Sequence, residues 1–227
     1  MGQDKTKLWY FENFNLMKAL PPKELTRLNT SSKMREVPKK HIIYFPEESS
    51  NSVYLVKKGK VKISRLSEDG REIIMAILGP GEIFGESAIT DPSSNRDEFA
   101  EATEDTLLCL MFSEIIRDLM AKDASFGLKI TKIIGFRFKK IQCRFESLIF
   151  KASDERVKSF IKDLANEEGQ KTGDGEIEIK LNLTHEDIGK LTATSRQMVT
   201  TVLNDLEKKD LVSYDRRKIL VKNIDRL

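Results

Sequence analysis

The sequence predicts an α+β chain in which one long helix separates a half rich in short strands from a half rich in short helices. Residues 123–151 contain no proline and only two glycines, Gly127 and Gly135, and their apolar residues recur at spacings of four and three, as on one helical face. Before this segment, short apolar runs alternate with turn signals at regular spacing, which is typical of a sandwich, roll or barrel. After it, two short amphipathic helices precede a hairpin pattern.

An apolar seam runs along the long helix. It consists of Ile130, Ile134, Phe138, Ile141, Phe145 and Leu148. Much of the remaining helix surface is charged, through Lys129, Lys132, Arg137, Lys139, Lys140 and Arg144. A helix of this length would extend about 40 Å, and such a seam is typical of two helices that pair as a short coiled coil. A single core helix is the alternative, but the change in character on either side favours pairing of two subunits through residues 126–150.

The strand-rich half is expected to begin with an aromatic, amphipathic helix over residues 8–20 and a second short helix over residues 22–32. Strands are then expected at residues 42–45, 52–58, 61–66, 73–78, 99–102 and 106–112. The sequence Glu68-Asp69-Gly70 is typical of a hairpin, and Gly79-Pro80-Gly81 of a further turn. Residues 113–122 predict a short helix with Ser113 as its N-cap.

The composition shifts after the long helix. Ser153 is expected to cap a helix over residues 154–166, which carries an apolar stripe. Residues 167–175 are polar and glycine-rich, and so predict a loop. Residues 176–183 alternate apolar and polar side chains, which predicts a strand.

The most informative local pattern begins at Thr184. Thr184-His185-Glu186-Asp187 resembles a capping box that opens a helix ending at Thr192. Ala193-Thr194 would form a tight turn, although many such turns use glycine at the first position. Residues 195–208 predict a second helix with an apolar inner side, and residues 212–221 predict a hairpin with a basic tip. Together these elements are typical of a winged helix-turn-helix, whereas a pair of solvated amphipathic helices is the alternative reading.

The outer face of the second helix carries long polar side chains and hydroxyls and no acid. Its members are Arg196, Gln197, Thr200, Thr201 and Asn204. An arginine in the first turn can donate two hydrogen bonds to guanine, a glutamine can pair with adenine, and threonines suit a thymine methyl or a phosphate. Ser195 and the helix N-terminus can hold a phosphate. The residues expected to contact DNA are therefore Thr194, Ser195, Arg196, Gln197, Thr200 and Thr201, with Arg216, Arg217 and Lys218 of the wing as positioning contacts.

Composition limits the alternatives. The chain has 227 residues, a formal net charge of +3 and two cysteines, Cys109 and Cys143. Two thiols are too few for a thiolate-held iron–sulfur cluster or a disulfide framework, so buried free thiols in a reducing compartment are expected. The sequence contains no apolar run of membrane-spanning length and no signal-peptide pattern, which predicts a soluble, cytoplasmic protein without a membrane partner.

The order of several short motifs is specific in combination. Gly79-Pro80-Gly81-Glu82 leads to Phe84-Gly85-Glu86, and Ile188-Gly189 and Thr194-Ser195-Arg196 follow the long helix. In these features, over residues 14–222, the chain resembles the cyclic-AMP receptor protein and fumarate–nitrate reductase regulator family. The resemblance implies a homodimeric transcription regulator that binds a near-palindromic site on double-stranded DNA, with RNA polymerase as a further partner.

The resemblance also implies a division of the chain. Residues 1–122 would form a cyclic-nucleotide-binding-like effector domain, a jelly-roll-like double-stranded β-helix. Residues 123–151 would form the dimerisation helix, and residues 152–227 the winged helix-turn-helix DNA-binding domain.

The family's cyclic-nucleotide site can be compared with this sequence. The family uses a Gly-Glu pair, whose glutamate reads the ribose hydroxyl, and then an arginine and a hydroxyl residue for the cyclic phosphate. Gly85-Glu86 and Arg96 match this pattern, but Asp97 stands where the hydroxyl is expected. On the long helix, Ile141 and Gln142 replace the two hydroxyl residues of the cAMP-responsive member. We therefore expect that the pocket does not bind cAMP, and three alternatives stay open: it is empty, it serves another small-molecule effector, or a structural ion pair between Glu86 and Arg96 closes it.

Two other classes of function compete with DNA binding. The first is a module that binds a small molecule and signals through protein contacts, which a non-basic outer face on the last domain would have favoured. The second is an enzyme, but the chain has only His41 and His185 and contains no Ser/His/Asp, Cys/His, phosphate-loop or metal-ligand pattern. Because neither cluster cysteines nor a Cys/His set for haem is present, no metal or cofactor is expected.

Overall fold

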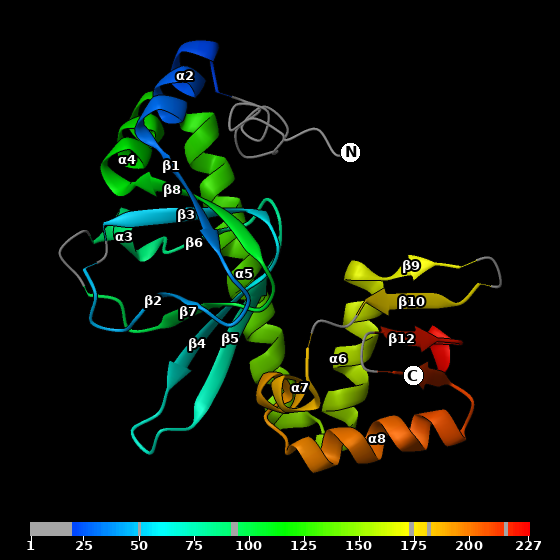
Figure 1. The fold of residues 1–227 in the computed structure, drawn as a ribbon. Coiled ribbons are helices and arrows are strands. Elements are labelled where there is room, and N and C mark those ends of the chain that lie inside the picture. The colour runs from blue at the N-terminus through cyan, green and yellow to red at the C-terminus, as the bar shows by residue number, and fades with distance from the viewer. Residues whose placement is uncertain (1–19, 50, 92–94, 173–174, 181–182, 216–217) are drawn as a thin grey trace. The chain divides into compact units, whose positions relative to one another are not determined.

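The structure is a computed structural model that describes residues 20–49, 51–91, 95–172, 175–180, 183–215 and 218–227 (Figure 1). The chain divides into two compact units, residues 1–71 with 75–139 and residues 72–74 with 140–227. Helix α5 (Ala124–Phe150) contributes residues to both units. The helix expected over residues 8–20 lies, apart from Leu20, outside the described residues.

The first unit contains helix α2 (Pro22–Ser31) and two four-stranded sheets, ordered β1-β8-β3-β6 and β2-β7-β4-β5. The strands are β1 (Lys33–Val37), β2 (Ile42–Tyr44), β3 (Ser52–Lys58), β4 (Val61–Leu66), β5 (Glu72–Leu78), β6 (Ile83–Phe84), β7 (Phe99–Ala102) and β8 (Thr106–Phe112). Consecutive strands alternate between the two sheets, except β4 and β5, which the turn around Gly70 joins. This alternation is the arrangement of a jelly-roll-like β-roll, and it confirms the mixed helix and sheet fold class.

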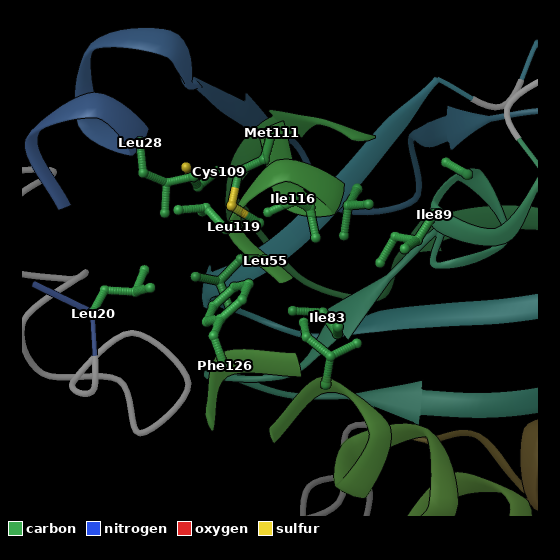
Figure 2. Packing of buried hydrophobic residues seen from close by; sticks show 13 residues of the cluster. Leu20, Leu28, Leu55, Ile83, Ile89, Cys109, Met111, Ile116, Leu119 and Phe126 are labelled. Carbon is green, nitrogen blue, oxygen red and sulfur yellow. The ribbon is translucent and has the colours of Figure 1, made fainter. Parts of the chain in front are cut away.

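Strand β3 lies at the centre of the packing, since six of its seven residues are buried. Val53 and Leu55 on one face pack into a cluster with residues of α2, α4 (Ser113–Lys122) and α5, including Phe126 (Figure 2). On the other face, Tyr54 and Val56 pack against side chains of the second sheet. The sheet that contains β3 is therefore covered by helices on one face and by the other sheet on its second face.

The starts of the helices differ by one residue from the prediction. Ser113 is the first residue of α4 rather than its N-cap, and Phe112 in the cap position offers no side-chain hydrogen bond. Asp123 supplies the missing signal for α5, because its carboxylate accepts hydrogen bonds from the backbone N–H groups of Ser125 and Phe126 at 2.9 and 3.2 Å. Short α3 (Ser87–Thr90) completes the helices of this unit.

Helix α5 buries only its beginning against the described part of the chain. Phe126 and Ile130 belong to the core, whereas the later residues of the predicted seam are exposed. Their exposed fractions are 38% for Ile134, 60% for Phe138, 37% for Ile141, 62% for Phe145 and 47% for Leu148. Arg137, which the sequence assigned to the charged surface, is instead largely covered, with 17% of its side chain exposed.

The second unit is built on α6 (Ser153–Glu168), α7 (His185–Thr192), α8 (Arg196–Lys208) and a sheet ordered β11-β12-β10-β9. Its strands and final 3-10 helix are β9 (Gln170–Lys171), β10 (Ile177–Lys180), β11 (Val212–Tyr214), β12 (Lys218–Val221) and η1 (Ile224–Arg226). The N-cap of α6 and the start of the loop that follows this helix differ from the prediction. Ala152, not Ser153, occupies the N-cap of α6, and the helix runs on to Glu168 before β9 begins.

The predicted winged helix-turn-helix is confirmed. Helix α7 ends at Thr192 as expected, and Ala193 turns the chain in the left-handed conformation, with φ 50° and ψ 48°. Gly189 allows this turn to close, since a Cβ there would lie 2.9 Å from the carbonyl oxygen of Thr194. Val199 and Leu203 on the inner side of α8 are completely buried in the core of the unit.

Replacing Ala193 by glycine should stabilise the protein. The left-handed conformation costs a non-glycine residue about 1–2 kcal/mol, and the extra freedom of glycine in the unfolded chain costs about 0.4–1 kcal/mol. We therefore expect Ala193→Gly to raise the free energy of unfolding by about 0.5–1 kcal/mol in urea denaturation. A stability equal to or below that of the unchanged protein would contradict the strain assigned to this turn.

Candidate functional site

Arg96 is buried in the first unit although it carries a full positive charge. The residue is 4% exposed, and its Nη2 donates a hydrogen bond to the backbone oxygen of Ser52 at 2.8 Å. The guanidinium carbon lies 4.0 Å from the centre of the Tyr44 ring and 5.6 Å from that of Tyr54. Nη1 is buried and has no hydrogen-bond partner within the described parts of the chain. Because buried donors are normally paired, Nη1 is available to an anionic ligand.

Gly85 follows strand β6 and faces this guanidinium. Its φ is +74°, and a Cβ at this position would lie 2.8 Å from Nη1 of Arg96 and 2.9 Å from the Ser52 oxygen. Any side chain here would therefore collide with the arginine or with the backbone. The structure thus brings together Gly85 and Arg96, as the sequence comparison with the family implied.

Glu86 does not pair with Arg96, so the expected ion pair is wrong. Its carboxylate accepts a hydrogen bond of 2.5 Å from Nη1 of Arg137 on α5, and Nη2 of the same arginine donates to the backbone oxygen of Ile83 at 2.5 Å. Arg137 thereby ties the long helix to the segment that carries Glu86. No local pattern predicts this contact, because the two residues are 51 positions apart in the chain.

Asp97 faces away from Arg96. Its side chain is 73% exposed and forms an ion pair with Arg65 of β4. The chain bends at Asp97 and Glu98 before β7 (Phe99–Ala102) begins, so Arg96 is buried beside an exposed Asp97. The Asp97 carboxylate therefore pairs with Arg65 instead of lying against Arg96.

Glu98, not Asp97, is the acid that turns inward. It accepts a hydrogen bond of 2.9 Å from the Tyr44 hydroxyl. Burial raises the pKa of Glu98, the Tyr44 hydrogen bond opposes this rise, and the negative charges of Glu86 and Asp97 add to it. Burial also raises the pKa of Tyr44, so its hydroxyl stays protonated and donates to the glutamate.

The two residues of α5 that the family comparison singled out, Ile141 and Gln142, belong to the second compact unit, and both are exposed. Cys143, the next residue, is also exposed, so only Cys109 fits the expectation of buried thiols.

The DNA-reading candidates lie on and before α8 in the second unit. The Thr184 side chain accepts a hydrogen bond from the Asp187 N–H at 3.1 Å, and the Asp187 carboxylate accepts one from the Thr184 N–H at 2.9 Å, which completes the predicted capping box. Ser195 caps α8 by accepting a hydrogen bond from the Met198 N–H at 3.1 Å. Thr194 is half-buried, and its hydroxyl lies 3.1 Å from that of Thr192, so it supports the turn.

The outer face of α8 is open. Arg196, Gln197, Thr201 and Asn204 are exposed, and Thr200 is half-buried. From Arg196 to Asn204 this face carries one positive charge and no carboxylate, and the exposed acids Asp205 and Glu207 follow only toward the end of the helix. This combination suits a polyanion that also presents hydrogen-bonding base edges.

Arg156 on α6 holds the turn in place, a role that no local sequence pattern predicts. Its Nε donates to the backbone oxygen of Thr192 at 2.8 Å, and its Nη2 donates to that of Ala193 at 2.9 Å. Nη1 donates to the backbone oxygen of Lys151 at 3.1 Å. One guanidinium therefore joins the end of α7 to the residue that follows α5.

Of the three cations that were expected in the wing, only Lys218 lies among the described residues. Lys218 is half-exposed, and its ammonium lies 3.2 Å from a carboxylate oxygen of Glu178 on β10. This pair would have to open for Lys218 to reach a phosphate. Arg216 and Arg217 lie outside the described residues.

Two searches of the described residues bear on other classes of site. No group of three or more His, Cys, Asp or Glu side chains in them is arranged to hold a metal ion. None of the helices that the structure describes is long and apolar enough to cross a membrane.

Both units match known protein families. Residues 34–123 match the cyclic nucleotide-binding domain, and residues 155–227 match the Crp-like helix-turn-helix domain. The chain is 30% identical over 180 residues to a global nitrogen regulator of a Nostoc species, covering 79% of this chain and 80% of that protein. It is 26% identical to the CRP-like cAMP-activated global transcriptional regulator of Mycobacterium tuberculosis, covering 93% of this chain and 94% of that protein.

A solved structure agrees with these relatives. A mutant of CooA from Carboxydothermus hydrogenoformans has a TM-score of 0.75 at 28% identity, covering 87% of this chain and 86% of that chain. The fold and the matched domains define a class of transcription regulators with a cyclic-nucleotide-binding-type sensor domain and a helix-turn-helix DNA-binding domain. The chain belongs to the cyclic-AMP receptor protein and fumarate–nitrate reductase regulator family.

Proposed function

We propose that two copies of this chain bind a near-palindromic site on double-stranded DNA and regulate transcription from it. The observation that carries this proposal is the outer face of α8, where Arg196, Gln197 and Thr201 are exposed and no acid lies between Arg196 and Asn204. The Met198 N–H donates a capping hydrogen bond to Ser195 in the first turn of α8, and this is the turn that enters the major groove in helix-turn-helix proteins.

The copies would pair through residues 126–150. The exposed seam on α5 supports this, because Phe138, Phe145 and Leu148 together exceed the scattered apolar exposure that is usual on a monomer. A twofold pair of α8 helices would read two half-sites about one helical turn apart, roughly 34–36 Å. Contact with RNA polymerase on the bound DNA is part of the same proposal. A regulator of bacterial transcription acts in the cytoplasm, and we assign it no catalytic activity.

We further propose that the first unit senses a small anionic molecule at Arg96. The buried Nη1 of Arg96 supports this, because it supplies a positive charge and a donor that the described chain does not use. Gly85 leaves the space beside it, and Glu86, held by Arg137, offers an acceptor for a hydroxyl group. A ligand that bonds both Arg96 and Glu86 would change the contact that Glu86 makes with Arg137 of the long helix.

We do not propose cAMP as this ligand. Arg137 already forms an ion pair with the carboxylate of Glu86. A ribose hydroxyl must therefore share that carboxylate with Arg137 or displace the arginine. Ile141 and Gln142 also offer no pair of hydroxyls to a purine. Each hydrogen bond that is lost costs about 0.5–1.5 kcal/mol, and every 1.4 kcal/mol weakens binding about tenfold.

Titration calorimetry tests the pocket. We expect no binding of cAMP or cGMP at micromolar concentration to the unchanged protein. Because Asp97 points toward Arg65 and away from Arg96, we expect that Asp97→Ser does not bind cAMP or cGMP at this concentration either. Micromolar affinity for cAMP in the unchanged protein would overturn this assignment, and a large gain in Asp97→Ser would show that Asp97 faces the ligand after all.

Selection from random DNA sequences tests the reading of bases. Arg196→Ala should weaken the best site by about 1–3 kcal/mol and relax the preference at one base pair in each half-site. Lys218→Ala is the matched control, because a phosphate contact carries no sequence information. It should weaken binding evenly and lower the slope of log affinity against log salt by about one for each copy. An unchanged sequence preference in Arg196→Ala would contradict the role of α8.

A further inference from the structure

Asn204 lies on α8 one turn beyond Thr200, and the wing fixes its amide. The side-chain oxygen of Asn204 accepts a hydrogen bond of 2.7 Å from the hydroxyl of Tyr214 in β11. An asparagine amide has one oxygen acceptor and two N–H donors. Its oxygen has two lone pairs, and Tyr214 uses one of them and holds the oxygen toward the wing, so the exposed amide presents mainly its donors to whatever lies against this face.

Tyr214 is held in turn by His185, the first residue of α7. The two ring centres are 5.8 Å apart, with an angle of 51° between the rings. Nδ1 of His185 lies 3.0 Å from the hydroxyl oxygen of Thr200, which itself donates to the backbone oxygen of Arg196 at 3.0 Å. Because the Thr200 hydroxyl donates its hydrogen to the Arg196 oxygen, the Thr200 oxygen accepts the hydrogen bond from His185, and Nδ1–H is the donor. A chain of contacts from α7 to the wing thus fixes one edge of α8, which includes Thr200 and Asn204.

We infer that Asn204 is a further base-reading residue and that the Tyr214 hydroxyl determines which base it selects. This inference rests on the proposed reading of DNA by α8. Asn204 follows Arg196 by eight residues, about 12 Å along the helix axis, so the two side chains would meet different base pairs.

The chemistry of the base edges then fixes the preference. A free asparagine binds adenine with both its oxygen and its N–H, accepting from N6 and donating to N7. Asn204 is held out of this arrangement by Tyr214, whose hydroxyl uses one lone pair of the amide oxygen and keeps that oxygen toward the wing. Its donors fit bases with acceptors in the major groove and no donor beside them, which are guanine, through O6 and N7, and thymine, through O4. We therefore expect guanine or thymine, and not adenine, at the base that Asn204 meets in each half-site.

Two substitutions in the full-length protein test this inference by selection from random DNA sequences. Asn204→Ala should abolish the preference at one position of each half-site and weaken the best site about three- to tenfold per half-site, as expected for one lost hydrogen bond. Tyr214→Phe removes only the hydroxyl and keeps the ring that packs on His185. It should leave binding to random DNA within about twofold and raise the frequency of adenine at that same position, because the freed oxygen can accept from N6.

Arg196→Ala provides the matched reference, since it should alter a different position of the motif. If the unchanged protein selects no motif, the proposed function fails. If Arg196→Ala alters the motif while Asn204→Ala and Tyr214→Phe leave every position intact, only the present inference fails. An even loss across all positions in Asn204→Ala would identify a phosphate contact and would also overturn it. If the thermal transition shows that Tyr214→Phe does not fold, the DNA motif selected by Asn204→Ala decides by itself whether Asn204 reads a base.

Discussion

The apolar seam on helix α5 is the constraint on which the other features of this protein depend. Phe126 and Ile130 anchor the start of the helix in the core of the first unit, but the seam continues through Phe138, Phe145 and Leu148 without cover from the described chain. Burying a large apolar side chain contributes about 1.5–3 kcal/mol, so leaving several of them in water is costly. The same helix carries Arg137, which bonds Glu86 beside the candidate pocket, so whatever covers the seam acts next to the sensor.

Arginine side chains bonded to backbone carbonyl groups recur at the functional segments. A guanidinium has five donors in a fixed planar arrangement and can therefore fix two or three carbonyl groups at once, which a lysine cannot do with the same geometry. Arg137 and Arg156 lie on helices, and the carbonyl groups that the three arginines bind lie at the ends of strands and helices or just beyond them. The contacts are Arg96 with Ser52, Arg137 with Ile83, and Arg156 with Lys151, Thr192 and Ala193.

Local patterns predicted most of the elements, because each depends on residues close together in the chain. The capping box at Thr184, the turn at Gly70 and the periodicity of α8 are of this kind. Strand β1 was missed because its mostly exposed residues follow no apolar alternation, and strands β6 and β9 are only two residues long.

The pairing of charges at the candidate site could not be read from the sequence. The residues near Arg96 were found from their order in the chain, yet the partner of Glu86 proved to be Arg137 and that of Asp97 proved to be Arg65. Such pairs depend on how distant segments pack and on which side of a strand a residue faces. The fixing of Asn204 by Tyr214 belongs to the same class, since a helix and the wing must first come together.

Light scattering gives the most direct measurement of the central claim, that a second copy of the chain covers the seam of α5. Phe138 and Phe136 allow a matched comparison, because they are 60% and 70% exposed and lie on opposite sides of the helix. We expect the unchanged protein and Phe136→Glu to have twice the 26.0 kDa mass of one chain. Phe138→Glu should have the mass of a single chain. A single-chain mass for the unchanged protein, or an intact dimer in Phe138→Glu, would contradict this claim.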